Sequence, residues 1–143
     1  MIKEETRDLF TTDPDYALVH CISSDFALGA GIALRFNQMG VKKALKENFE
    51  SKWDGSGYCI RTDVPQRTVY NLITKKNYWH KPTYKTLGEL LDDLKVQLDC
   101  DGCKRIAMPL IGCGLDRLEW SEVYKYLCAV FKDTDIEILV CKL

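Results

Sequence analysis

Two short glycine-containing segments have residue types that suit the binding of a phosphate. Gly29-Ala30-Gly31 and Ile111-Gly112-Cys113-Gly114-Leu115 each follow an apolar run and precede a helical pattern. Glycine lets the backbone approach a ligand closely, and free N–H groups at a helix start favour phosphate. Neither segment matches a P-loop or a full dinucleotide fingerprint, so a tight turn explains each one alone. Together, on one edge of a sheet, they suggest a diphosphate held from both sides.

Two charged residues stand where they could act on a ligand held by these loops. Lys75 follows an apolar strand pattern over residues 69–73, and Asp116 ends the second glycine loop. An amine can act as a nucleophile and a carboxylate as a general acid or base. Alone, Lys75 is more typical of a solvated strand end and Asp116 of a helix cap. Their shared position at the predicted ligand edge favours a catalytic pair.

Three further features each have a functional and a structural interpretation. Asp8 could accept a hydrogen bond from the amino group of adenine, or it could form an Asx turn. His20 lies within an apolar strand pattern, which favours a core histidine. Cys100-Asp101-Gly102-Cys103 is a CxxC motif, but a zinc site needs four ligands, and the chain has one CxxC and two histidines. We therefore expect seven reduced cysteines, no metal and no cofactor.

Apolar runs rich in β-branched residues alternate with helical patterns, which predicts an α/β sheet covered on both faces. Strands are predicted over residues 18–22, 58–62, 68–73, 106–110 and 136–141, and helices over residues 29–39, 41–49, 83–98 and 120–131. In such folds ligands bind beyond the carboxyl ends of the strands, where residues 23–31 and 110–117 fall. No repeat or linker interrupts the pattern, so residues 1–143 are predicted to form one domain.

Charge and hydropathy limit the partners that this chain can serve. Its 20 Lys and Arg against 21 Asp and Glu give a net charge of -1, which disfavours general nucleic-acid binding. No apolar run reaches the length of a membrane span, and the N-terminal residues lack an apolar signal region. We expect no membrane association, an intracellular location in the cytoplasm or nucleus, and a monomer.

Six segments, in their order along the chain, resemble the macrodomains. They are Asp8-Leu9-Phe10, His20-Cys21-Ile22-Ser23, Gly29-Ala30-Gly31-Ile32-Ala33, Leu72-Ile73-Thr74-Lys75-Lys76, His80-Lys81-Pro82-Thr83-Tyr84 and the run from Met108 to Leu118. Within that family the chain is most similar to the terminal ADP-ribose protein glycohydrolase branch. The resemblance extends from about Ile2 to Leu143 and implies a three-layer α/β/α macrodomain with a mixed central sheet and an ADP-ribose cleft.

The resemblance also implies roles for individual residues. Lys75 would attack the anomeric carbon of the distal ribose, with Asp116 as the acid/base. Asp8 and Leu9 would lie at the adenine, and Leu143 would close over the ligand. The other implied ADP-ribose contacts, around the distal ribose and the phosphates, are Ser23, Gly29, Ala30, Gly31, Ile32, Pro109, Ile111, Gly112, Cys113, Gly114 and Leu115. The sequence departs from the family at Arg7, where a glycine is usual.

The activity implied by the resemblance is hydrolysis of an ester that links ADP-ribose to a Glu or Asp side chain. The partners would be ADP-ribose and mono-ADP-ribosylated proteins. One alternative is a phosphatase that acts on ADP-ribose 1″-phosphate in the same cleft, and another is a reader that binds ADP-ribose without turnover. The presence of both Lys75 and Asp116 favours the glycohydrolase.

Overall fold

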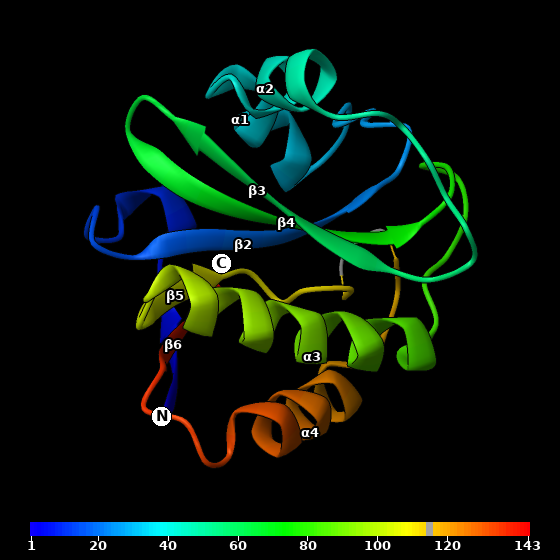
Figure 1. Ribbon diagram of the computed structural model, residues 1–143. Coiled ribbons are helices and arrows are strands. Elements are labelled where there is room, and N and C mark those ends of the chain that lie inside the picture. The colour runs from blue at the N-terminus through cyan, green and yellow to red at the C-terminus, as the bar shows by residue number, and fades with distance from the viewer. Residues whose placement is uncertain (114–115) are drawn as a thin grey trace.

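The computed structural model describes residues 1–113 and 116–143, and within those ranges it forms a six-stranded sheet with two α-helices on each face (Figure 1). The strands are β1 (Ile2–Thr6), β2 (Ala17–Ser23), β3 (Tyr58–Val64), β4 (Arg67–Lys75), β5 (Arg105–Met108) and β6 (Glu137–Lys142). The helices are the 3-10 turn η1 (Leu9–Thr11), α1 (Ile32–Gln38), α2 (Val41–Asn48), α3 (Tyr84–Asp101) and α4 (Trp120–Phe131).

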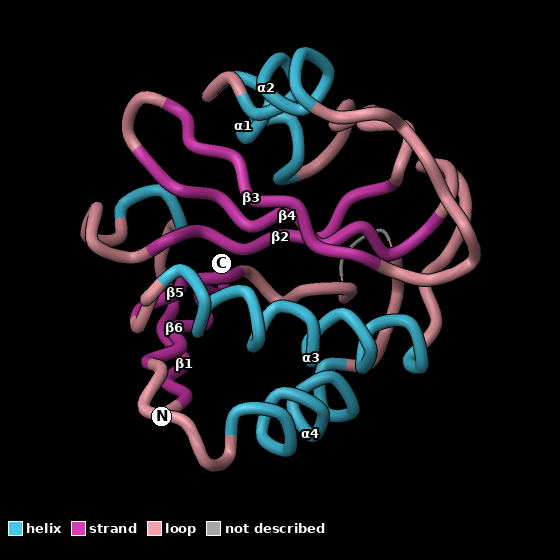
Figure 2. Tube along the Cα trace, viewed as in Figure 1, coloured by secondary structure: helices cyan, strands magenta, loops and turns pink. Residues whose placement is uncertain are grey.

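The sheet is mixed, with the strand order β1-β6-β5-β2-β4-β3. Strands β1, β6, β5, β2 and β4 pair in parallel, and β3 pairs with β4 in the antiparallel direction. Helices α1 and α2 cover one face, whereas α3 and α4 cover the other (Figures 1 and 2). The three-layer α/β/α architecture with a mixed sheet is thereby confirmed. The carboxyl ends of the five parallel strands meet along one edge.

Each side of the sheet has its own apolar core. The face under α3 and α4 is filled by a stripe of leucines from α3 at helical spacing. These are Leu87, Leu90, Leu91, Leu94 and Leu98, all fully buried. On the opposite face, Phe36 of α1 and Leu45 of α2 pack with Leu18 and Ile73 of the central strands. The two cores hold β2 and β4 rigidly, and these strands carry the central part of the predicted site.

Several element bounds differ from the sequence predictions for identifiable reasons. The helix expected from Gly29 begins at Ile32, because Gly31 has a φ of 59° that a helix cannot contain. The strand expected to reach Leu110 ends at Met108, because Pro109 has no N–H to offer the sheet. Helix α3 continues to Asp101, where the left-handed Gly102 caps it. Strand β4 continues to Lys75 instead of ending at Ile73.

His20 is a buried core residue, as the sequence pattern favoured, with 1% of its surface exposed. Its Nε2 lies 2.6 Å from Oδ1 of Asn71, and its ring stacks on Phe36 at 3.8 Å between centroids. The Asn71 amide in turn donates to the Ile60 carbonyl oxygen and to Thr62 Oγ1. Burial lowers the pKa of His20 from 6.5 to about 4, against the smaller opposing effect of the Asn71 hydrogen bond.

We expect the free energy of unfolding to fall as pH decreases from about 6.5 to about 4. In that window the unfolded chain protonates His20 while the folded protein keeps it neutral, so unfolding is favoured. At 1.36 kcal/mol per pKa unit, the lowered pKa of His20 corresponds to a decrease of about 3 kcal/mol in the free energy of unfolding. Urea unfolding across this range should give a shallower pH dependence for His20→Gln than for the wild type. Equal slopes in the two proteins would contradict the assignment.

Candidate active site

The predicted site residues follow the carboxyl ends of the parallel strands, in a definite order along the sheet edge. Lys75 ends β4, Ser23 ends the adjacent β2, and Pro109 follows β5. Asp8 follows β1 at the far end of the same edge. The four inter-strand spacings from β4 to β1, at about 4.8 Å each, give roughly 19 Å between the two ends. The edge therefore suits an elongated ligand with different groups at its two ends.

At the β4 end, the Lys75 amine and the Asp116 carboxylate form a direct ion pair. The two residues are 41 positions apart in the sequence, and Lys75 ends β4 whereas Asp116 lies in the segment between β5 and α4. Their side chains are 11% and 14% exposed, so the pair is mostly shielded but open to a ligand from one side. A carboxylate in contact with an amine can accept its proton, which is the arrangement that a lysine nucleophile needs.

Strand pairing fixes the position of Lys75. The register between β2 and β4 shifts between Ile22 and Ser23, so that Ser23 pairs with Lys75 and Thr74 is passed over. Ser24 then donates its backbone N–H to the Lys75 carbonyl oxygen at 2.9 Å and its Oγ to the Lys76 carbonyl oxygen at 2.6 Å. The end of β4 is thus joined to the loop after β2 by two hydrogen bonds from Ser24.

Residues on either side of Asp116 are joined by a backbone hydrogen bond. Gly112 has a φ of 74°, and its carbonyl oxygen accepts the Leu118 N–H at 2.7 Å. A Cβ at Gly112 would lie 2.8 Å from Leu118 Cδ1, so the Leu118 side chain would have to shift, and the positive φ would strain a larger residue here. The cap position of α4 is Glu119, without a side-chain cap bond. The alternative of Asp116 as the helix cap is therefore wrong, and its carboxylate contacts Lys75 instead.

Two cysteines lie beside the pair but are poor nucleophiles. Burial raises the pKa of the Cys21 thiol above its usual range, and the nearby Asp116 carboxylate adds to the effect. Burial also raises the pKa of Cys113 to about 11, with Glu119 and Asp116 as further causes. Both thiols are protonated at neutral pH, and a thiol attacks far more slowly than a thiolate. Neither thiol is therefore favoured as a nucleophile at this end of the edge.

The loop after β2 is ordered by Asp25 and leaves its glycines open to solvent. Asp25 accepts hydrogen bonds from Ser23 Oγ and from the Ala27 N–H. Phe26 and Leu28 are buried and have φ values of 54° and 42°, which non-glycine residues rarely adopt. Residues 29–31 are exposed, and Ile32 is half-buried at the start of α1. A strained backbone with exposed N–H groups at a sheet edge is typical of a ligand-binding loop.

At the β1 end, Asp8 already has partners. Its carboxylate accepts the Phe10 N–H at 3.0 Å, which forms the Asx turn that caps η1, and it pairs with Arg35 at 2.8 Å. These hydrogen bonds, the Arg35 one first, hold the pKa of Asp8 below its usual value. The Arg35 guanidinium lies over the Phe10 ring at 4.1 Å from its centroid. Leu9 is buried beneath this group.

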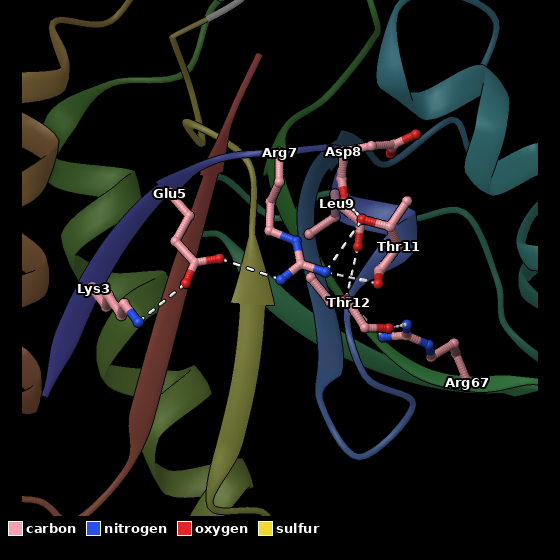
Figure 3. A network of polar contacts seen from close by, with 8 residues as sticks. All are labelled: Lys3, Glu5, Arg7, Asp8, Leu9, Thr11, Thr12 and Arg67. Carbon is pink, nitrogen blue, oxygen red and sulfur yellow. Dashed lines mark hydrogen bonds and ion pairs between the residues drawn. The ribbon is translucent and has the colours of Figure 1, made fainter.

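Arg7 occupies the position of the family glycine without strain. Its backbone lies outside the positive-φ region that would require glycine. Figure 3 shows its side chain turned to Glu5 and Thr11, with the guanidinium donating to the Thr11 carbonyl oxygen at 2.8 Å, while Arg67 holds the adjacent Thr12. Arg7 therefore stabilises the η1 turn, which Asp8 caps. The Arg7 guanidinium bonds Glu5 and Thr11, whereas the Asp8 carboxylate bonds Phe10 and Arg35.

The other predicted contacts differ in how far the structure describes them. Ile111 and Gly112 are buried in the second loop, and Pro109 and Cys113 are half-buried there. Leu143 follows the last residue of β6 near the β1 end and is 99% exposed, so it covers nothing in this structure. Gly114 and Leu115 lie outside the described residues.

Two other features of the described part of the chain, the CxxC motif and a surface hollow, do not form a comparable site. Cys100 is exposed on α3 and Cys103 is half-buried, and no three His, Cys, Asp or Glu side chains in residues 1–113 and 116–143 gather as a metal site would require. Across those same ranges, no helix combines the length and hydropathy of a membrane span. A hollow of about 510 Å³ lies between α3 and α4, away from the strand ends, and has no charged pair like Lys75 and Asp116 among its lining residues.

Sequence reasoning missed three residues that shape the site. Arg35, Asp25 and Ser24 were not singled out, although they anchor Asp8, the first loop and the end of β4 respectively. Asp25, two residues after a strand, had a recognisable signal, since aspartate there often folds the backbone into an Asx turn. Arg35 had none, because its partner Asp8 is 27 residues away.

Comparisons with known proteins identify the family. No protein-family model matches the sequence. The human ADP-ribose glycohydrolase OARD1 is 42% identical over 135 residues, which cover 93% of this chain and 86% of that protein. The macrodomain of Mycobacterium tuberculosis DarG has the same fold, with a TM-score of 0.80 at 24% identity, over 99% of this chain and 97% of the other. Thermosipho africanus DarTG in complex with ADP-ribose aligns with a TM-score of 0.72 at 20% identity, over 94% of this chain and 39% of the other. This chain belongs to the macrodomain family, in the branch of the terminal ADP-ribose glycohydrolases.

Proposed function

We propose that this protein hydrolyses the ester that links ADP-ribose to a Glu or Asp side chain of a modified protein. The observation that carries the proposal is the direct contact between Lys75 and Asp116 at one end of the strand-end edge. A relative with 42% identity is named ADP-ribose glycohydrolase, and a structural neighbour was solved with ADP-ribose bound. Both support the same ligand and the same class of reaction for this chain.

The layout of the edge fits ADP-ribose lying along it. The nucleophile stands at the β4 end, the two glycine loops follow β2 and β5 in the middle, and Asp8 stands at the β1 end. ADP-ribose has the same sequence of groups, namely a reactive ribose, a diphosphate and adenine. With the anomeric carbon at Lys75, the diphosphate meets the backbone N–H groups of the loops. The adenine amino group then reaches Asp8, whose two carboxylate oxygens both accept hydrogen bonds from Arg35.

The reaction needs a nucleophile and a proton carrier. Asp116 takes a proton from the Lys75 amine as the nitrogen bonds to the anomeric carbon, and the acceptor carboxylate leaves with the electrons of the C–O bond. Asp116 then returns the proton to Nζ as water attacks the same carbon and the C–N bond breaks. The remaining proton of the water passes to solvent. Because a carboxylate is a good leaving group, the first step needs no further acid.

The test is to incubate the protein with glutamate-ADP-ribosylated protein and to follow free ADP-ribose. We expect release of ADP-ribose and of the unmodified acceptor. A parallel reaction with ADP-ribose 1″-phosphate measures phosphate release. Faster turnover of the phosphate would favour the phosphatase, and binding without turnover of either substrate would favour the reader.

We expect ADP-ribose itself to bind with a Kd in the micromolar range, about -8 kcal/mol. The physical reason is that two loops and two end groups contact one ligand along the edge. Titration calorimetry measures the affinity, with AMP as the control ligand. AMP spans only the adenine end, so it should bind much more weakly. No saturation at millimolar ADP-ribose would contradict the ligand assignment.

A further inference from the structure

An exposed aromatic pair lies on the loop that directly follows β4, the strand that ends at Lys75. Tyr78 and Trp79 are 64% and 65% exposed, and their rings contact each other edge to face at 5.1 Å between centroids. Trp79 also lies beside the His80 ring, at 5.5 Å. Aromatic side chains are costly to leave in water and are enriched where proteins bind partners. The proposed chemistry uses neither ring.

This loop is held in place relative to Lys75. The Asn77 N–H donates to His80 Nδ1 at 3.1 Å, and the His80 N–H donates back to the Asn77 carbonyl oxygen at 3.0 Å. The Tyr78 N–H donates to Asp25 Oδ2 at 3.0 Å, which joins the loop to the one that follows β2. A surface fixed in advance loses less entropy when it binds a partner. The backbone that carries the two rings is therefore joined to the loop that follows β2.

The chain segment that carries the pair is basic, although Asp25 from the loop after β2 contacts its backbone. Residues 75–88 contain four lysines and His80 but no Asp or Glu, in a chain whose net charge is -1. Lys75 is paired with Asp116, whereas Lys76 and Lys81, which flank the aromatic residues in the sequence, are exposed. A local excess of cations attracts an anionic partner and orients it as it approaches.

We infer that residues 76–81 form an acceptor platform, which binds the polypeptide that carries the ADP-ribose and prefers acceptors with further carboxylates near the modified residue. The inference rests on the proposed function, because the acceptor leaves from the carbon held at Lys75. Trp79 is four residues from Lys75. An extended acceptor chain advances about 3.3 Å per residue, so three or four flanking residues cover the roughly 13 Å that four residues can span.

The charge pattern favours a polypeptide over a nucleic acid on this platform. The basic stretch ends at α3, where Glu89 and Asp92 are exposed. A nucleic acid carries a negative charge at every nucleotide and needs a basic groove that follows its backbone. A short acidic peptide needs only the few cations that residues 76–81 supply. The aromatic rings would then contact the peptide backbone and its aliphatic carbons.

The test compares two peptides that carry glutamate-linked ADP-ribose, one with flanking glutamates and one with flanking serines. We expect the wild type to have a lower KM for the acidic peptide. The double variant Tyr78→Ala/Trp79→Ala should raise that KM about tenfold, as expected for the loss of interface anchors, and Lys81→Glu should remove the preference. Both variants should bind ADP-ribose as the wild type does. Lys132→Glu, which makes the same charge change on exposed Lys132 after α4, should alter neither KM.

Three results would overturn the inference. Equal KM values for the two peptides in the wild type would remove the preference that the platform explains. If the double variant lost affinity for free ADP-ribose by as much as its KM for the acidic peptide rose, the rings would contact the nucleotide and not the acceptor. Faster turnover of ADP-ribosylated single-stranded DNA than of either peptide, lost in the double variant, would assign the platform to nucleic acid. If the wild type releases ADP-ribose from neither peptide, the proposed function itself fails.

Discussion

Lys75→Ala is expected to abolish release of ADP-ribose while the affinity for ADP-ribose stays close to that of the wild type. If the Lys75 amine forms a bond to the anomeric carbon, its removal eliminates an interaction made only in the chemical step. Such a loss appears in kcat, at roughly a thousandfold or more, with little change in ligand binding. Single-turnover kinetics on glutamate-linked ADP-ribose and calorimetry on free ADP-ribose measure the two quantities separately.

Lys75→Arg separates nucleophilic attack from a purely electrostatic role. Arginine keeps the positive charge and can still pair with Asp116, but its guanidinium stays protonated and cannot attack carbon. We expect this variant to be as inactive as Lys75→Ala. Attack by lysine also predicts a covalent adduct between Lys75 and ADP-ribose, which mass spectrometry of the acid-quenched wild type should detect. An active Lys75→Arg would exclude the covalent route.

Lys76→Ala is the matched control for the nucleophile. Lys76 is exposed beside Lys75, and its carbonyl oxygen, not its amine, accepts the bond from Ser24. We expect it to retain most of its kcat on a small ADP-ribosyl ester, which does not reach the acceptor platform. An inactive Lys76→Ala beside an active Lys75→Ala would mean that the assignment of the nucleophile is off by one residue.

The layers of this fold follow from the sequence because its local patterns agree with one another. The leucine spacing of α3 and the apolar run of β2 each fix an element type, and their alternation leaves a covered sheet as the consistent solution. The bounds were less predictable where one backbone angle decides them. Gly31 at φ 59° delays α1, and this angle depends on the loop before it, which is itself shaped by Asp25.

The sequence could nominate single residues such as Lys75 and Asp116 for the candidate site, but it could not predict how they lie relative to one another. Lys75 and Asp116 were each as well explained by structural roles, and the residues alone could not bring them together across 41 positions. Their contact depends on the strand order, which places β5 beside β2 and β2 beside β4. Strand order is a property of long-range pairing that no local window contains. The Arg35–Asp8 pair was missed for the same reason.

The second large effect concerns the carboxylate, and Asp116→Asn is the sharpest probe of it. Asparagine keeps the size of aspartate and can still accept a hydrogen bond from the Lys75 amine, but it cannot take up a proton. If Asp116 takes the proton from Nζ during attack and returns it to Nζ when the C–N bond breaks, its loss should lower kcat by at least about a hundredfold. This is the range expected for loss of a general acid/base. ADP-ribose affinity should change little, because the side-chain shape is conserved.

Asp116→Ala should also lose turnover, but it has two effects at once, and comparison with Asp116→Asn separates them. It removes the proton carrier, and it also leaves the Lys75 amine, 11% exposed, without its partner. Both variants leave the Lys75 cation without a counter-charge, but alanine also removes the hydrogen-bond acceptor and leaves a void, so it should melt at a lower temperature than Asp116→Asn. Asp135→Asn is the control, since Asp135 pairs with Lys104 on the surface at 3.0 Å, far along the chain from the site. It should retain wild-type kcat. Near wild-type kcat in Asp116→Asn would show instead that the carboxylate only holds Lys75 in position, and the proton would then have to leave Nζ through water.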